Sequence, residues 1–229
     1  MDEKMMLEWR KTRIIMAKIV VFDSGRGGEE VVKYLEDELP ILEVKRVAGS
    51  EEIEAKHTKY GMCVAIEHEL LPYIFKVDLI VLGGFLVSQV VEWLQSKYPG
   101  QKFVAVKCDL EELSPTMMNN VMILADDKLK KTWQYRRLKM NFKDYNVMEP
   151  QCAHWRELVC DKTILGMNLR LKNELAKYKS DKIDTIVIMN TYFTKLEENL
   201  FEVFGRQIWI IDFKKKLRKD INEALGLKE

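Results

Sequence analysis

The stretch AKIVVFDSGRGG, residues 17–28, decides the fold. Its apolar part is rich in residues that favour β structure, ends at Asp23, and continues as a glycine-rich turn from Ser24 to Gly28. An amphipathic segment that opens with two glutamates follows. This order is typical of a buried strand, a tight turn and a helix N-terminus at the carboxyl edge of a parallel sheet, where such sheets bind ligands. Asp23 and Ser24 are therefore candidates for contact with a small polar ligand.

The glycine-rich turn is not a nucleotide-binding motif. Gly25 and Gly27 lack the third glycine of the dinucleotide pattern, because Glu30 stands in its place, and no Gly-Lys-Ser/Thr follows. Glu29 and Glu30 already complement the helix dipole that a pyrophosphate would use. A site for another polar ligand is favoured over a plain tight turn.

Composition narrows the class of protein. The 229 residues include 37 Lys and Arg against 36 Asp and Glu, so net charge does not draw the chain to nucleic acid or to an anionic membrane. No apolar run is long enough to span a membrane, and Met1–Lys4 does not resemble the start of a secretory signal. The four cysteines and three histidines show no metal-ligand spacing. We expect a reduced, cytoplasmic protein without metal or membrane contact.

Short apolar runs alternate with longer amphipathic ones, which predicts parallel sheets with helical crossovers. The predicted strands are Lys18–Asp23, Val44–Ala48, Leu79–Gly83, Phe103–Lys107, Val121–Ala125, Thr185–Asn190 and Ile208–Asp212. The predicted helices are Glu29–Glu38, Val64–Tyr73, Ser88–Lys97, Lys128–Leu138, Thr163–Tyr178, Lys195–Phe204 and Lys214–Leu225. The polar stretch Asp109–Asn120 is interpreted as a linker between two units.

Three predicted strand ends resemble one family. Residues 23–28 resemble the Asp-Ser-Gly-x-Gly-Gly opening of cofactor-independent glutamate racemases, within the aspartate/glutamate racemase superfamily. Residues 78–88 and 184–193 resemble the strands that carry that family's Cys-Asn-Thr-Ala-Ser and Gly-Cys-Thr-His-Tyr motifs. Weaker similarities lie at Cys152–Val159 and Ile210–Asp212.

The resemblance implies an α/β fold of two pseudo-symmetric, flavodoxin/Rossmann-like units with parallel sheets and an inter-domain cleft. The expected division is an N-terminal extension at 1–16, a first domain at 17–113 plus 208–229, and a second domain at 114–207. The family needs no cofactor, so none is expected. A homodimer is also expected from the family, with Met5, Met6 and Trp9 of the extension as candidate interface residues.

The departures from the family pattern bear on the chemistry. Both family cysteines are replaced, by Gly84 and Asn190, and other polar positions become Phe85, Leu86, Leu129 and Tyr192. In the family, one cysteine removes the α-proton of an amino acid and the other returns a proton on the opposite face. Glycine has no side chain and a neutral amide is a poor base. Loss of one general base costs about 10²–10⁴-fold in rate, and loss of both removes the reaction path. The sequence therefore predicts a pseudoenzyme with respect to amino-acid racemisation, with no catalytic residue assigned.

The expected function is a cleft for a small carboxylate, an amino-acid-like metabolite or a protein partner. The candidate ligand-binding residues are Asp23, Ser24, Tyr60, Gly61, Phe85, Ser88, Asn190, Thr191 and Tyr192. Tyr60 and Gly61 are included because they resemble the family's Pro-Tyr-Gly substrate loop without its proline.

Two alternatives stay open. The first is an active isomerase or lyase of small carboxylic or amino acids that uses Asp23 as its base, with Lys195 or Tyr192 contributing an acid or a cation. The second is a module that binds nucleic acid or an acidic partner through the basic, aromatic-containing stretch Lys128–Lys139. A solvated helix face is favoured for that stretch, so nucleic acid is not the expected partner. Cys108 is a candidate reactive thiol at the cleft rim, although an ordinary half-buried cysteine is favoured.

Overall fold

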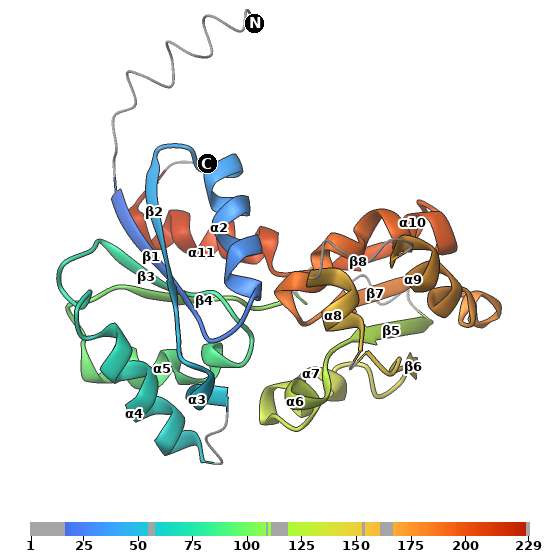
Figure 1. Cartoon of the computed structure of the whole chain (residues 1–229), viewed down its shortest axis with the longest axis horizontal. Helices are drawn as coiled ribbons and strands as arrows, with labels where there is room; N and C mark the ends of the chain where they lie inside the picture. Colours follow the sequence, from blue (N-terminus) through green and yellow to red (C-terminus); the bar gives the residue numbers. More distant parts are fainter. Residues whose placement is uncertain are drawn as a thin grey trace, which may run out of the picture.

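The chain forms two four-stranded parallel sheets flanked by helices, as seen in the computed structural model (Figure 1). The structure describes residues 17–54, 58–108, 110, 119–152, 154–160 and 167–227. The expected extension at 1–16 and most of the expected linker lie outside these residues. The predicted α/β fold with two parallel sheets is confirmed.

The first sheet has the strand order β2-β1-β3-β4. Its central strand β1 is buried almost throughout because it is covered on both faces, as its run of apolar residues predicts. Its register places Phe22 opposite Leu82 and Asp23 opposite Ala48, so the turns that follow β1 and β3 emerge at one edge. The elements are β1 (Ala17–Asp23), α2 (Gly27–Glu38), β2 (Leu42–Ala48), α3 (Glu51–Glu54), α4 (Lys59–Leu70), β3 (Leu79–Leu82), η1 (Val87–Val90), α5 (Val91–Lys97) and β4 (Phe103–Ala105).

The second sheet repeats this arrangement with the order β6-β5-β7-β8. β5 and β7 are its buried central pair, and their carboxyl ends lead to Asp126 and Asn190. Its elements are β5 (Asn120–Leu124), α6 (Asp127–Lys130), α7 (Trp133–Met140), β6 (Asn146–Met148), α8 (Trp155–Cys160), α9 (Met167–Ala176), η2 (Lys179–Asp181), β7 (Thr185–Ile188), η3 (Thr191–Leu196), α10 (Glu197–Phe204) and β8 (Trp209–Ile211), and α11 (Lys214–Leu225) follows.

The expected position of residues 208–229 needs a correction. β8 extends the second sheet, where Thr185 pairs with Trp209, because a crossover through α10 brings β8 beside β7. The helix α11, by contrast, packs on the first unit, where it contacts α2 and β4. The domain boundaries themselves stay a prediction.

Two local features differ from the sequence-based expectation. The single helix expected at 128–138 is divided into α6 and α7. The Thr132 hydroxyl causes the division, because it donates to Leu129 O at 2.7 Å and accepts the Tyr135 N–H at 3.2 Å, which ends one helix and caps the next. The short strand β6 was not predicted, because only three residues form it and none is fully buried.

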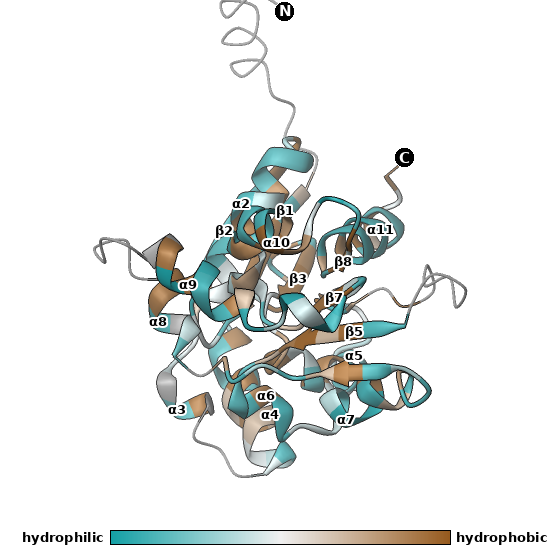
Figure 2. Ribbon diagram, turned by 90° about the vertical axis from the view of Figure 1, so that its right-hand side faces the viewer, coloured by the Kyte–Doolittle hydropathy of each residue, from teal (hydrophilic) through white to brown (hydrophobic). Residues whose placement is uncertain are grey.

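Hydropathy follows the layers of the fold. The central strands are brown in Figure 2, whereas the outward faces of α2, α10 and α11 are largely teal. Buried side chains form core clusters around both sheets. Within the part of the chain that the structure describes, no helix has the length and apolar character needed to cross a membrane.

Candidate ligand site between the two sheets

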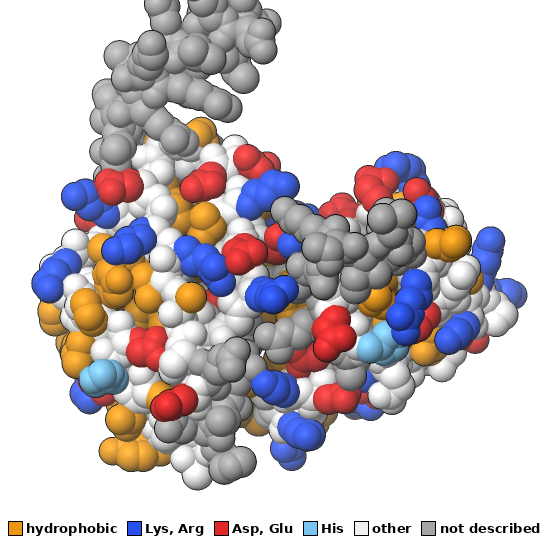
Figure 3. Space-filling view, viewed as in Figure 1, with side chains coloured by type: hydrophobic (Ala, Val, Ile, Leu, Met, Phe, Trp, Pro, Cys, Tyr) orange, Lys and Arg blue, Asp and Glu red, His pale blue; other side chains and the backbone are white. Residues whose placement is uncertain are grey.

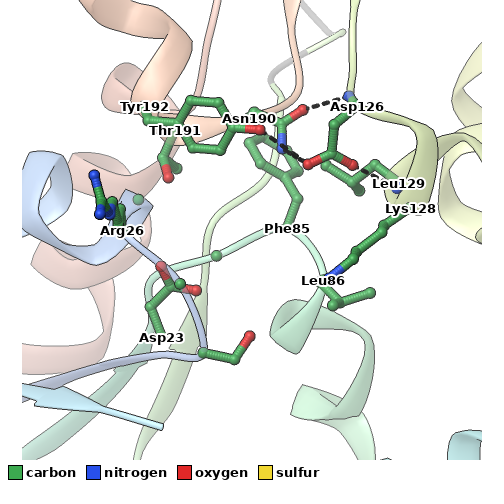
Figure 4. A pocket seen from close by; sticks show the side chains of 14 residues that line it. Asp23, Arg26, Phe85, Leu86, Asp126, Lys128, Leu129, Asn190, Thr191 and Tyr192 are labelled. Atoms are coloured by element: carbon green, nitrogen blue, oxygen red, sulfur yellow. Dashed lines mark hydrogen bonds between the residues drawn. The ribbon is translucent and has the colours of Figure 1, made fainter. Parts of the chain in front are cut away.

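A cavity of about 50 Å³ lies where the carboxyl ends of β1, β3, β5 and β7 meet. Each strand contributes the turn that follows it, so residues far apart in the sequence converge on one space (Figure 4). The lining residues are Asp23, Ser24, Gly25, Arg26, Gly27, Gly84, Phe85, Leu86, Asp126, Lys128, Leu129, Asn190, Thr191 and Tyr192. This is the edge at which parallel α/β sheets bind their ligands.

Asp23 dominates the first wall of the cavity. Its side chain is buried, and Oδ2 accepts the N–H of Gly28 at 2.7 Å, near the start of α2. Its other oxygen, Oδ1, lies only 2.1 Å from the point where a Cβ at Gly84 would be. The carboxylate therefore occupies the space that any side chain at residue 84 would need.

Arg46 holds the glycine-rich turn from the neighbouring strand β2. Its guanidinium donates to Gly25 O at 2.9 Å and to Glu29 Oε1 at 3.0 Å. The same turn approaches the second wall closely, because a Cβ at Gly27 would lie 1.9 Å from Thr191 Oγ1. Glycine at position 27 thus allows the two units to meet beside the cavity.

Asp126 organises the second wall. As the N-cap of α6, it accepts the Leu129 N–H at 2.9 Å through Oδ1. Oδ2 accepts from Asn190 Nδ2 at 2.8 Å and from the Tyr192 hydroxyl at 2.9 Å, and the Asp126 N–H donates to Asn190 Oδ1 at 2.8 Å. Both ends of the Asn190 amide are therefore used by Asp126. The sequence analysis did not select Asp126, although an aspartate directly after a buried strand and three residues before an apolar position is an N-cap signal.

The cavity brings together six of the nine candidate ligand-binding residues: Asp23, Ser24, Phe85, Asn190, Thr191 and Tyr192. The other three do not line it. Tyr60 is 73% exposed in the first turn of α4, where the Gly61 N–H is used by the Thr58 cap. The Ser88 hydroxyl donates to Gly84 O at 2.8 Å, in the segment that precedes η1. The role of all nine in ligand binding stays a prediction.

The side chains considered as a candidate acid and a candidate reactive thiol interact with other groups of the same chain. Lys195 pairs with Glu30 at 2.8 Å. The Cys108 thiol lies 3.5 Å from Ile188 O, to which it donates. Burial raises the pKa of the Cys152 thiol to about 12, so this buried thiol is protonated near neutral pH. Among the described residues, no three His, Cys, Asp or Glu side chains are grouped so as to hold a metal ion.

The basic stretch Lys128–Lys139 is partly taken up by packing. Tyr135 and Leu138 are buried, Lys139 pairs with Glu149, and Lys130 Nζ donates to Pro150 O at 2.9 Å. On the face shown in Figure 3, acidic and basic side chains are interspersed over both units. The nucleic-acid alternative stays an untested prediction.

Comparison with known proteins gives a consistent set of relatives. No protein-family model matches the chain. A glutamate racemase of Clostridium botulinum is 23% identical over 83% of this chain and 77% of its own length. One of Thermoanaerobacter pseudethanolicus is 24% identical over 92% of this chain and 81% of its own length.

Solved structures with similar folds come from the same group. The fold is similar to that of Escherichia coli glutamate racemase in complex with L-glutamate and the activator UDP-MurNAc-ala, with a TM-score of 0.72 and 19% identity over 91% of this chain and 82% of that one. It is also similar to an aspartate racemase homologue of Pyrococcus horikoshii, with a TM-score of 0.60 and 14% identity over 90% of this chain and 98% of that one.

The class of protein is thus a two-sheet parallel α/β protein with a cavity between the strand ends. The sequence relatives are glutamate racemases, and the solved structures that share the fold are a glutamate racemase and an aspartate racemase homologue, so the chain is similar to proteins of this group.

Proposed function

We propose that this chain is a racemase-superfamily homologue that binds a small carboxylate or amino-acid-like ligand and does not carry out two-cysteine racemisation. One observation carries the proposal: Gly84 and Asn190, which the sequence resemblance aligns with the two family cysteines, both line the cavity, and neither supplies a base. Among the fourteen lining residues that the structure describes there is no thiol.

The geometry around both positions supports this proposal further. At Gly84 the Asp23 carboxylate fills the space beside the backbone. At Asn190 the amide is tied to Asp126 through two hydrogen bonds of 2.8 Å. Racemisation needs a proton donor and a proton acceptor on opposite faces of the α-carbon. Asn190 can be neither while Asp126 holds it.

Hydrogen exchange at the substrate α-carbon tests the proposal. The full chain is incubated in deuterated water with each enantiomer of glutamate and aspartate, and the α-proton signal is followed by NMR. We expect no loss of that signal and no formation of the opposite enantiomer. Deuterated product of the opposite hand would contradict the proposal.

A second candidate function is favoured by the position of Asp23. Its Oδ1 atom lies where a side chain at residue 84 would be, so a carboxylate replaces the family thiol on this wall. A single base removes and returns a proton on one face only. This candidate therefore predicts deuterium incorporation with retention of configuration, abolished in Asp23→Asn. The same NMR experiment, with chiral analysis of the product, separates the two candidates.

A further inference from the structure

A second cavity, larger than the candidate ligand site, lies between the two units. Its volume is about 390 Å³, and Phe85 lines both cavities, so the two spaces adjoin. From the first unit it is lined by η1, the start of α5 and the residues that follow β4, and from the second unit by α7. We call it the α7 cavity. Its volume falls within the range of about 300–1,000 Å³ that is typical of ligand pockets.

Trp133, the first residue of α7, gives the α7 cavity an exposed aromatic wall. Its side chain is 41% exposed and lines the cavity. The Arg137 guanidinium lies 5.9 Å from the centre of the indole ring, and Lys59 Nζ of α4 lies 5.8 Å from it. Cations at this distance are attracted to the ring electrons. The indole is therefore held at the junction of the two units, where a flat ring can stack on it.

Cations from both units border the α7 cavity. Arg137 and Lys107 line it, and both side chains are exposed. The Arg136 side chain, also exposed, donates to Lys131 O at 3.1 Å, so the positive charge continues along the surface. Together with Lys59, these exposed residues form what we call the cationic tract: Lys59, Lys107, Lys131, Arg136 and Arg137. Figure 3 shows Lys and Arg side chains gathered over α6 and α7, at the bottom of the view.

We propose that the α7 cavity and the cationic tract bind single-stranded nucleic acid. The phosphates lie along the cationic tract, and one unpaired base enters the cavity and stacks on Trp133. Surfaces that bind single strands combine these two features, a row of cations for the backbone and an aromatic ring for a base. The site is separate from the smaller cavity, so this inference does not rest on the proposed function.

The interior of the α7 cavity suits a base better than a phosphate. Val91, Val106 and Leu138 supply buried apolar wall, and the Glu92 carboxylate also lines the cavity. A phosphate moved inside would lose hydration and meet a like charge. A base presents its apolar faces to these walls, and its amino group can donate to a carboxylate, as cytosine N4 does.

Two other anionic partners fit less well. An acidic peptide would use the cationic tract, but its carboxylates do not match the aromatic wall. An anionic membrane requires a helix that can insert an apolar face, whereas α7 buries Tyr135 and Leu138 in the protein core. The sequence pattern favoured a solvated helix face because Lys59 and Lys107 are far from α7 in the chain, and only the fold brings them beside it.

Fluorescence anisotropy on the full chain tests the inference. The probe is a fluorescein-labelled oligodeoxycytidylate of about ten nucleotides, within the range of about 4–16 that one binding module covers. The competitors are the unlabelled strand, the same strand in a duplex, CMP and poly-glutamate. The variants are Trp133→Ala, Trp133→Tyr and Arg137→Gln.

Two matched control variants lie away from the α7 cavity. Trp209→Ala removes a tryptophan that is 45% exposed on β8. Arg206→Gln removes an arginine that also lies over an aromatic ring, that of Phe201, at 5.4 Å. Neither residue lines the cavity.

We expect the single strand to bind, with an affinity that falls as salt is added. Trp133→Ala weakens binding about 10-fold without changing the salt dependence, because a stacking contact carries no charge, and Trp133→Tyr recovers part of the loss. Arg137→Gln reduces the slope of log affinity against log salt by about 0.7, the value for one phosphate contact on a single strand. Both controls leave affinity and slope unchanged.

Photo-cross-linking makes the test independent of the stability of the variants. An oligonucleotide that contains 5-iodocytidine is irradiated in complex with the wild-type chain, and the modified residue is identified by mass spectrometry. We expect the adduct at Trp133. Adducts at other residues only would contradict the inference.

Several results of the anisotropy experiment would also overturn it. If the strand does not bind at about 50 mM salt, or if Trp133→Ala and Trp209→Ala weaken binding equally, the α7 cavity does not hold a base. If poly-glutamate or the duplex competes as strongly as the unlabelled strand, the surface binds anions in general. If CMP competes as strongly, the site takes a free nucleotide instead of a strand.

Discussion

At the scale of single residues, the contact between Asp23 and Gly84 is the most informative. Asp23 Oδ1 lies 2.1 Å from the point where a Cβ at residue 84 would be. Restoring a side chain there requires the carboxylate to move, and that carboxylate also accepts the Gly28 N–H at 2.7 Å. The Asp23 carboxylate thus fills the space that a side chain at residue 84 would need.

This contact predicts strong coupling between the two residues. Gly84→Ala lowers the free energy of unfolding by about 1–3 kcal/mol, the usual cost of overpacking. The same change in an Asp23→Ala background costs much less, because the clashing oxygen is gone. Urea denaturation of wild type, both single variants and the double variant measures the coupling.

Gly100→Ala serves as the control for that cycle. A Cβ at Gly100 meets only the ring edge of Phe75, at 3.2 Å, and that exposed ring can move. Gly100→Ala should therefore lower the free energy of unfolding only slightly, and by the same amount in the wild-type and Asp23→Ala backgrounds. Additive effects of Gly84→Ala and Asp23→Ala would contradict the packing account.

The sequence could predict part of the candidate site. Asp23, Ser24 and the positions 84 and 190 follow apolar strands, so parallel topology alone brings them to one edge. Asp126 follows such a strand too. Its hydrogen bonds to Asn190, however, join side chains 64 residues apart in the sequence, and the sequence pattern does not show which side chains meet across that separation. Tyr60 was selected by motif resemblance alone, and no strand end fixes it near the cavity.

At the scale of secondary-structure elements, Arg46 joins β2 to the turn before α2. Arg46→Met removes hydrogen bonds of 2.9 Å to Gly25 O and 3.0 Å to Glu29 Oε1. We expect a loss of about 1 kcal/mol in unfolding free energy and faster amide hydrogen exchange in residues 25–28. Arg46→Lys keeps the charge but not the two-pronged contact, so it should recover only part of the loss. Unchanged exchange in the turn would contradict this role.

Glu174 links α9 to α8 and gives a pH dependence. Burial tends to raise the pKa of its carboxyl, but hydrogen bonds from Trp155 Nε1 at 2.8 Å and with His154 Nε2 at 2.9 Å outweigh this and lower the pKa below its ordinary value. A carboxyl with a lowered folded-state pKa stabilises the fold above its unfolded value and loses that contribution as the pH falls.

Glu174→Gln should therefore destabilise the protein by about 1 kcal/mol near neutral pH. The difference from wild type should shrink as the pH falls below about 4.5. Urea denaturation at a series of pH values measures it. Glu157→Gln is the control, because Glu157 is exposed on the neighbouring helix α8. If the difference in unfolding free energy between wild type and Glu174→Gln instead grows toward acid pH, the ionised form of Glu174 is not the form that stabilises the fold.

The elements themselves were largely predictable. Buried strands such as β1 and β7 have continuous apolar runs, and α11 was predicted with the bounds that it has. Failures occurred where local side-chain chemistry outweighs periodicity, as at Thr132, or where an edge strand is only three residues long, as in β6. The sheet to which β8 belongs depends on pairing across space, which periodicity does not encode.

At the scale of the whole molecule, the two sheet units are tied together beside the cavity. Glu30 on α2 and Lys195 in η3 form an ion pair of 2.8 Å, and Gly27 packs closely against Thr191. The Cys108 thiol donates to Ile188 O from the other unit. A cavity built from both units keeps its shape only while such contacts hold.

The Glu30–Lys195 ion pair is therefore expected to limit local opening of η3. Lys195→Gln should speed amide hydrogen exchange in residues 191–196 by about 2- to 5-fold, the range expected for a partly exposed ion pair. The charge reversal Glu30→Lys with Lys195→Glu should restore protection, because the pair is re-formed with opposite polarity. Arg206→Gln breaks the pair between Arg206 and Glu198, which is more exposed and lies within the second unit, so it should leave η3 unchanged. Equal effects of Lys195→Gln and Arg206→Gln on amide hydrogen exchange in η3 would contradict this role of the ion pair. In that case, the close packing of Gly27 on Thr191 would be the contact that holds α2 against η3.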